Sequence, residues 1–261
     1  MVQTVKPEPY YSSPDDRVRL FRGDSLELLP LICADDAPNI IFADPPYFLS
    51  GGGSTCQSGE RVSVNKGTWD HAMAIDEVHA FNLKWLGICQ KVLDPHGSIW
   101  VSGTSHVIYS VGFALQQLNM KLLNDITWEK PNPPPNLSCR YFTHATETIL
   151  WAARDSESKH LFNYEEMKKI NDGKQMKSVW RFTAPGRSEK QFGKHPTQKP
   201  LALIDRILRA SGNPGDLVVD PFNGSATTGV AAARLGMRYI GVEMDPDFLA
   251  LSKQRLEAEF E

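Results

Sequence analysis

Short apolar runs recur along the chain, and most are followed by a segment with helical periodicity. They lie at Val18–Arg22, Asn39–Ala43, Ser98–Ser102, Leu122–Trp128, Thr148–Ala152, Leu217–Val219 and Tyr239–Val242. Runs this short and this continuous are typical of strands that are covered on both faces, as in a parallel sheet. We therefore predict a strand at each of them.

Amphipathic segments between these runs predict helices. They are Asp76–Leu93, His106–Leu118, Leu201–Ala210, Ala226–Leu235 and Pro246–Glu259. Gly236 directly follows the fourth of them, where a glycine is the usual C-terminal cap of a helix. The alternation of strands and helices predicts a doubly wound, mostly parallel α/β sheet of the Rossmann-like kind.

Composition narrows the class of protein. The 261 residues include 41% hydrophobic and 23% charged residues, which suits one large packed domain. No stretch approaches the roughly 18–20 apolar residues of a membrane helix, and the polar segment Met1–Arg17 does not resemble a secretory signal. The four cysteines are far apart, which disfavours a metal site or disulfides and predicts a reducing, cytoplasmic location.

Positive charge is concentrated in one part of the chain. Between Lys159 and Lys199 there are ten Lys or Arg and four Asp or Glu, a local charge of +6 in a chain of net charge −3. This region is either a solvated surface or a polyanion-binding face, because phosphate contacts dominate nucleic-acid affinity. The candidate nucleic-acid contacts are Lys174, Lys177, Trp180, Arg181 and Arg187.

The turn Asp44-Pro45-Pro46-Tyr47 follows a predicted strand, so we expect it at the carboxyl edge of the sheet, where ligands bind. Two prolines stiffen the turn. The Asp44 carboxylate and the Pro45 carbonyl then form two acceptors that suit an amino group, and the Tyr47 ring offers a stacking surface. The alternative is an ordinary turn at the end of a strand.

A second motif, Asp220–Gly229, also follows a predicted strand and begins a helix. Gly224 permits close backbone approach, and Glu243 ends the next strand, where an acidic side chain can bind ribose hydroxyls. The motif lacks the glycine pattern of dinucleotide sites and the lysine of phosphate loops. It therefore favours a nucleoside cofactor without phosphates, with a simple helix-capping loop as the alternative.

A third motif, Lys194–Pro200, precedes the helix predicted at Leu201–Ala210. Thr197 and Lys199 are candidates to hold a carboxylate. The alternative is an N-terminal helix cap.

These three motifs, in this order, resemble the beta class of S-adenosylmethionine-dependent DNA amino-methyltransferases over nearly the whole chain. The resemblance implies a circularly permuted, seven-stranded sheet with Asp24 and Ser25 at the cofactor adenine and Glu243 at its ribose. It places the methionine part of the cofactor near Asp44, Thr197, Lys199, Phe222, Gly224, Ser225, Thr227 and Thr228, with Asp220 shaping the loop. It divides the chain into a catalytic half (18–154), a basic recognition insert (155–193) and a cofactor-binding half (194–261).

The resemblance implies methyl transfer to the exocyclic N6 of adenine in duplex DNA, with the base flipped out of the helix and no metal. Asp44, Pro45, Pro46 and Tyr47 are the implied catalytic residues, and aspartate at position 44 favours adenine. The alternatives are an N4-cytosine enzyme, an RNA N6-adenine enzyme and a non-catalytic DNA-binding homologue. A homodimer and a cognate restriction endonuclease are possible partners in a restriction-modification system.

Two features bear on this expectation. The family usually has a glycine where this chain has Ala226, and a positive φ there strains the loop by about 1 kcal/mol. The segment Phe48–Lys66, rich in Gly, Ser and Thr, is predicted to be a mobile loop that closes over the flipped base.

Overall fold

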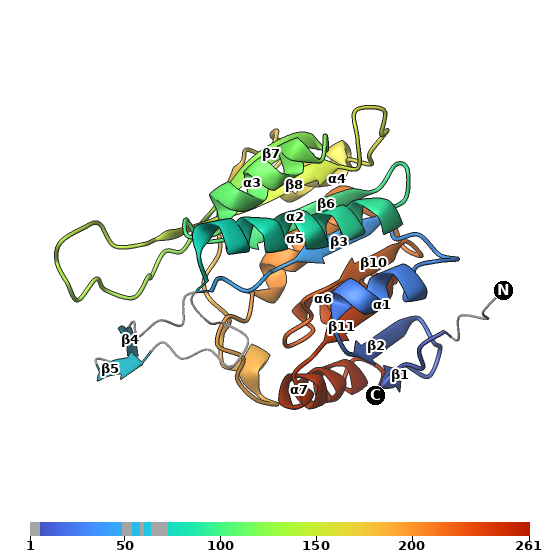
Figure 1. Ribbon diagram of the computed structural model, residues 1–261. Helices are drawn as coiled ribbons and strands as arrows, with labels where there is room; N and C mark the ends of the chain where they lie inside the picture. Colours follow the sequence, from blue (N-terminus) through green and yellow to red (C-terminus); the bar gives the residue numbers. More distant parts are fainter. Residues whose placement is uncertain (1–5, 49–53, 58–59, 64–72) are drawn as a thin grey trace.

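The computed structural model describes residues 6–48, 54–57, 60–63 and 73–261 (Figure 1). Most of the loop predicted at Phe48–Lys66 lies outside the described residues. The prediction that this loop closes over a flipped base therefore concerns residues that the structure does not describe. Within that segment, β4 (Ser54–Gln57) and β5 (Glu60–Ser63) pair as an antiparallel hairpin.

A single nine-stranded sheet forms the centre of the molecule, in the order β1-β2-β11-β10-β3-β6-β8-β7-β9. Its elements are β1 (Tyr11–Ser12), β2 (Val18–Arg22), β11 (Arg238–Glu243), β10 (Leu217–Asp220), β3 (Ile40–Ala43), β6 (Ser98–Gly103), β8 (Thr146–Ala153), β7 (Lys121–Glu129) and β9 (Val179–Arg181). The five strands from β2 to β6 are parallel, and β8 runs antiparallel to both β6 and β7. The seven predicted strands are confirmed, and the short strands β1 and β9 extend the sheet at its edges.

Helices cover both faces of the sheet, as the apolar runs predicted (Figure 1). One face carries α1 (Ser25–Ile32), α2 (Ile75–Val92) and α3 (Ile108–Gln117), and the other carries α4 (Tyr164–Ile170), α5 (Leu201–Ser211), α6 (Thr227–Arg234) and α7 (Pro246–Glu257). Successive residues of β3 enter different cores: Ile40 and Phe42 pack on one side, Ile41 and Ala43 on the other. Among the described residues, none of the helices is both long and apolar enough to cross a membrane.

The five predicted helices are confirmed, and α1 and α4 are additional. Helix α1 begins at an N-terminal cap, where the Asp24 carboxylate accepts a hydrogen bond from the Leu26 amide (2.8 Å). Pro30 lies inside this helix, and a proline there suggests a break rather than a helix. Gly236 ends α6 with a φ of 68°, which confirms the predicted cap.

The sheet changes its direction of winding between β10 and β3. From this point the chain proceeds to β11 on one side and to β6 on the other, which makes it the switch point where open α/β sheets bind ligands. Asp220 ends β10 and Asp44 follows β3, so both carboxylates lie at that crevice. The chain ends fall between the neighbouring strands β11 and β2, as the permuted arrangement predicted.

Part of the basic insert (155–193) belongs to the sheet and its core. Strand β9 pairs parallel to β7, and Met167 of α4 is buried in a core. Trp180 of β9 is only 5% exposed, packs near Trp100 and donates its indole N–H to the Lys177 carbonyl (2.9 Å). Its predicted role as a DNA contact is therefore wrong, because its ring faces the core rather than solvent.

Replacement of this residue tests the assignment to the core. We expect Trp180→Ala to lower the free energy of unfolding by about 3–5 kcal/mol, since it removes a large buried side chain. The neighbouring exposed Arg181→Ala is expected to change it by less than about 1 kcal/mol. Urea denaturation of both variants measures the difference, and equal effects would contradict a core role for Trp180.

Candidate active site

A cavity of about 560 Å³ opens at the switch point of the sheet. All three sequence motifs contribute to its lining, through Asp44–Tyr47, the Thr197–Lys199 segment and the loop around Gly224. Asp24, Ser25 and Glu243 line the same cavity. Residues far apart in the sequence thus meet at one site, at the carboxyl edge of the sheet where the Asp44 and Asp220 motifs were expected.

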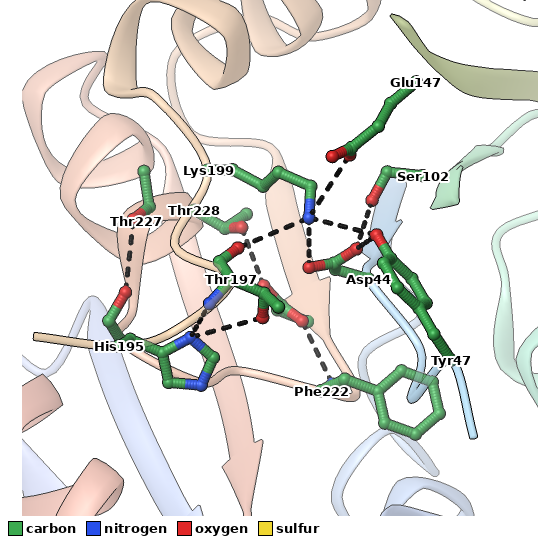
Figure 2. Close-up of polar contacts among 12 residues, drawn as sticks. Asp44, Tyr47, Ser102, Glu147, His195, Thr197, Lys199, Phe222, Thr227 and Thr228 are labelled. Carbon is green, nitrogen blue, oxygen red and sulfur yellow. Dashed lines mark hydrogen bonds and ion pairs between the residues drawn. The ribbon is translucent and has the colours of Figure 1, made fainter. Parts of the chain in front are cut away.

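The Asp44 carboxylate is held by three donors (Figure 2). Its Oδ1 accepts hydrogen bonds from the Tyr47 hydroxyl (2.6 Å) and the Ser102 hydroxyl (2.7 Å). Its Oδ2 forms an ion pair with the Lys199 ammonium. Burial of Tyr47, together with the nearby Asp44 charge, raises the pKa of its phenol, so the hydroxyl stays a donor. These bonds fix the carboxylate in one orientation.

Lys199 is at the centre of this cluster (Figure 2). Its side chain is 6% exposed, and its Nζ lies 3.2 Å from the Tyr47 hydroxyl and 3.4 Å from the Thr197 carbonyl. Burial disfavours the ammonium, but the carboxylates of Asp44 and Glu147 outweigh it and raise the pKa of Lys199. Lys199 is therefore charged, and it is bound to Asp44; its predicted role as a holder of a carboxylate stays a prediction.

Asp220 stabilises the loop that follows β10. This carboxylate accepts hydrogen bonds from the Phe222 amide (3.0 Å) and the Thr228 hydroxyl (2.7 Å). Complete burial raises the pKa of Asp220 to about 7, although both hydrogen bonds oppose the shift. Asp220 thus shapes the loop, while the Phe222 ring packs against Phe81 and Trp85 at the cavity.

Glu243 is in the place predicted for a ribose-binding residue. Its carboxylate accepts hydrogen bonds from the Gly224 amide (2.7 Å) and the Asp245 amide (2.9 Å). Burial nevertheless raises the pKa of Glu243 above that of an ordinary glutamate. Asp24 faces the same cavity and also caps α1.

A network of hydrogen bonds that sequence patterns did not reveal stabilises the Gly224 loop. The Asn223 side chain accepts from the Tyr239 hydroxyl (2.8 Å) and donates to the Ser252 hydroxyl (2.8 Å). Ser252 in turn donates to the Gly224 carbonyl (2.8 Å), and Arg255 binds the Thr227 hydroxyl (3.0 Å). Ser225 and Thr227 are themselves buried.

His195, Ser102 and Glu147 are further site residues that the sequence did not single out. The His195 ring packs edge-on against Phe248, with 4.3 Å between centroids, and burial lowers its pKa to about 4. Ser102 near the end of β6 has a detectable signal, since it occupies the carboxyl edge of a predicted strand. Glu147 has none, because its strand runs in the opposite direction.

Ala226 adopts the left-handed conformation, with φ 55° and ψ 33°, and is fully buried. Ala226 therefore has the positive φ for which backbone strain was expected, and this strain costs about 1–2 kcal/mol of stability. The methyl group is accommodated within the core that also contains Val230.

The remaining predicted DNA contacts lie outside the cavity. Lys174, Lys177, Arg181 and Arg187 are all exposed, and Arg181 lies 3.6 Å from the Glu129 carboxylate. Within the described parts of the chain, no group of three or more His, Cys, Asp or Glu side chains is arranged to hold a metal.

A mostly parallel α/β sheet with carboxylates and a glycine loop at its switch point is typical of the class of proteins that bind nucleoside cofactors there. The model of the DNA methylase family matches residues 39–254. The chain belongs to this family, which confirms the resemblance inferred from its motifs.

Relatives of the chain are type II methyltransferases. It is 51% identical to M2.DpnII of Streptococcus pneumoniae over 97% of this chain and 94% of that protein. It is 48% identical to M2.MboI of Moraxella bovis over 96% of this chain and 92% of that protein.

Solved structures share the fold. The M1.HpyAVI-SAM complex matches with a TM-score of 0.70 and 26% identity, over 92% of this chain and 98% of that one. The cytosine-N4-specific PvuII DNA methyltransferase matches with a TM-score of 0.74 and 22% identity, over 95% of this chain and 89% of that one.

Gly224 gives a test of the cavity geometry. It has a φ of 53°, and a Cβ built on it would lie 3.1 Å from the His195 ring. We expect Gly224→Ala to cost about 1–2 kcal/mol of stability through backbone strain and to weaken nucleoside cofactor binding by displacing the loop. Calorimetric titration with S-adenosylmethionine and thermal denaturation measure the two effects.

Gly173→Ala is the matched control, because Gly173 also has a positive φ (75°) but no atom within 4 Å of the added Cβ. It should lose stability without losing cofactor affinity. Equal affinities of the two variants would show that the close approach at Gly224 does not shape the binding site.

Proposed function

We propose that this chain transfers a methyl group from S-adenosylmethionine to the exocyclic N6 of adenine in duplex DNA. The observation that carries the proposal is that the Asp44–Tyr47 corner and the Gly224 loop line one cavity. The proposed cofactor site and the proposed acceptor for an amino group are thereby adjacent. Membership of the DNA methylase family supports the same reaction class.

The cavity residues fit the cofactor. Glu243 and Asp24 offer carboxylates for ribose hydroxyls and a base amino group, while the missing side chain of Gly224 keeps the loop close to the His195 ring. Phe222, Ser225, Thr227 and Thr228 surround the space proposed for the methionine part, with Thr197 at its rim. When bound, S-adenosylmethionine supplies an electrophilic methyl group on a sulfonium.

Asp44 and Pro45 are proposed to bind the acceptor. The exocyclic nitrogen is a weak nucleophile, because its lone pair is delocalised into the ring. Hydrogen bonds from its two N–H groups to the Asp44 carboxylate and the Pro45 carbonyl favour a pyramidal nitrogen with a directed lone pair. The carbon–sulfur bond of the sulfonium would break as the nitrogen–carbon bond forms, leaving a neutral thioether, and the nitrogen then releases one proton to solvent. The Asp44 carboxylate provides negative charge where positive charge develops on the nitrogen.

The surrounding residues orient this acceptor. Ser102 and Tyr47 fill both acceptor positions of Oδ1 of Asp44, so the amino group is proposed to donate to Oδ2, which Lys199 also contacts. Pro46 stiffens the corner, and Tyr47 provides a planar wall for the base. A base inside a duplex is too deeply stacked to enter, so it is flipped out.

Adenine is favoured over cytosine by the aspartate at position 44. The N4-cytosine reading is the second candidate, because the cytosine-N4-specific PvuII enzyme shares the fold. Analysis of nucleosides from methylated duplex DNA distinguishes the two products. Transfer to RNA in preference to duplex DNA would contradict both.

Further partners follow from this activity. The exposed basic residues of the insert are proposed to contact DNA phosphates. Relatives named type II methyltransferases support a place in a restriction-modification system, with a cognate endonuclease and a cytoplasmic location. A homodimer stays a prediction.

Replacement of the acceptor tests the reaction. We expect Asp44→Asn to lower the rate of methyl transfer to duplex DNA by about 10²–10³-fold, because it removes the charge that faces the developing cation. The measurement uses labelled S-adenosylmethionine in single-turnover experiments. Asp125→Asn, on the exposed side of β7, is the control and should act like the wild type. A fully active Asp44 variant would exclude the proposed role of the corner.

Charge reversal tests the DNA-binding surface. We expect Lys174→Glu, Lys177→Glu and Arg187→Glu together to weaken DNA binding, because each removes a cation that can neutralise a phosphate. The slope of log K against log salt concentration should become shallower by about 0.9 for every phosphate that is no longer neutralised. Titration of a fluorescent duplex at several salt concentrations measures the slope.

The control is a reversal of Lys84 and Lys91, which are exposed on α2 at the other face of the sheet. It should leave the slope nearly unchanged. If the insert variant kept the wild-type slope, the insert would not be part of the DNA interface.

A further inference from the structure

A second carboxylate reaches the Asp44 cluster from β8. Strand β8 is antiparallel to β6, and Thr148 pairs with Gly103, so the beginning of β8 lies at the same edge as the end of β6. The Glu147 side chain is 11% exposed and points toward Lys199 (Figure 2). Its Oε1 is paired with Lys130.

The other oxygen of this carboxylate has no hydrogen-bond partner. Glu147 Oε2 is buried and lies 3.8 Å from the Lys199 Nζ. A buried polar atom without a partner costs free energy, and native structures contain few of them. The orphaned oxygen indicates a partner that is absent in this arrangement of the cluster.

The three N–H donors of the Lys199 ammonium explain why Glu147 Oε2 has no hydrogen-bond partner. An ammonium has three donors. In this arrangement they face Asp44 Oδ2, the Tyr47 hydroxyl and the Thr197 carbonyl, so none is left for Glu147.

The same ammonium contacts the oxygen that the substrate needs and holds one of its two acceptor positions. Ser102 and Tyr47 already bind Oδ1 of Asp44, so the amino group of a flipped base would have to donate to Oδ2. Oδ2 can accept from both, but the Lys199 ammonium neutralises the negative charge that this oxygen offers to the base, so the two donors compete for that charge. A shift of the ammonium by roughly 1 Å would bring it within hydrogen-bond distance of Glu147.

We propose that Glu147 is a positioning residue that takes the Lys199 ammonium from Asp44 Oδ2 when the base amino group arrives. The cluster then has two arrangements. In one, Lys199 holds the empty Asp44 carboxylate in place; in the other, Glu147 holds Lys199 and Asp44 is open to the substrate. This inference rests on the proposed function, and it gives Lys199 a role other than binding a cofactor carboxylate.

Glu147→Gln tests the inference, because the amide keeps the shape of the side chain but attracts an ammonium far less. We expect its single-turnover methyl transfer rate to fall about 10–100-fold at saturating cofactor and DNA. Its affinity for S-adenosylmethionine should stay within about twofold of the wild type. The melting temperature should change little, because weakening of the Lys130 ion pair is offset by removal of negative charge from an oxygen without a hydrogen-bond partner.

Two variants complete the test. Glu129→Gln makes the same charge change on neighbouring strand β7, where Glu129 faces Arg181, and should keep the wild-type rate. Glu147→Asp keeps the charge on a shorter side chain, and it should recover a substantial part of the rate lost in the amide.

A double-mutant cycle with Lys199→Met measures the coupling. Glu147 acts through Lys199, so Glu147→Gln should cause no further loss of rate in the Lys199→Met background.

Three results would overturn the inference. Glu147→Gln could keep the wild-type rate of methyl transfer, Glu147→Gln and Glu147→Asp could lose the same amount of rate, or Glu147→Gln could lose affinity for S-adenosylmethionine and keep its rate. The last result would instead support the prediction that Lys199 binds the carboxylate of the cofactor. Failure of the proposed function itself looks different, because the wild-type chain would then methylate no adenine in duplex DNA.

Discussion

The parallel pairing of β10 with β3 is the constraint on which the site depends. Val218 pairs with Ile40 and Val219 with Ile41, so the two strands end together at the carboxyl edge of the sheet. One strand then continues into the glycine loop and the other into the proline corner. Because the chain winds away from this point in both directions, the two motifs face one cavity.

Much of the fold could be predicted from the sequence, because its signals are local. A buried parallel strand requires a continuous apolar run, as at Ile40–Ala43, and a helix between two strands requires apolar periodicity. The motifs at Asp44 and Gly224 were recognisable for a related reason: each directly follows such a strand. Helix α1 was missed because Pro30 hides its periodicity, and β1 and β9 are too short to have a pattern.

The rest of the site depends on contacts between distant parts of the chain. Lys199 and Asp44 are 155 residues apart, and nothing in either neighbourhood shows that they form a buried ion pair. Trp180 shows the opposite error. An aromatic residue among lysines suggests a nucleic-acid contact, but its alternation with exposed Val179 and Arg181 turns it toward the core. Composition alone does not show which face of an edge strand is buried.

The pairing of β11 with β2 has a consequence for the order of the motifs along the chain. Strand β11 leads to the C-terminus and β2 follows the N-terminus, yet the two are hydrogen-bonded neighbours, with Tyr239 beside Val18. Joining the backbone here and opening it in another loop would change the order of the two motifs along the chain but leave every strand neighbour the same. The spatial arrangement of the cavity thus depends on which strands are neighbours and not on which motif comes first in the chain.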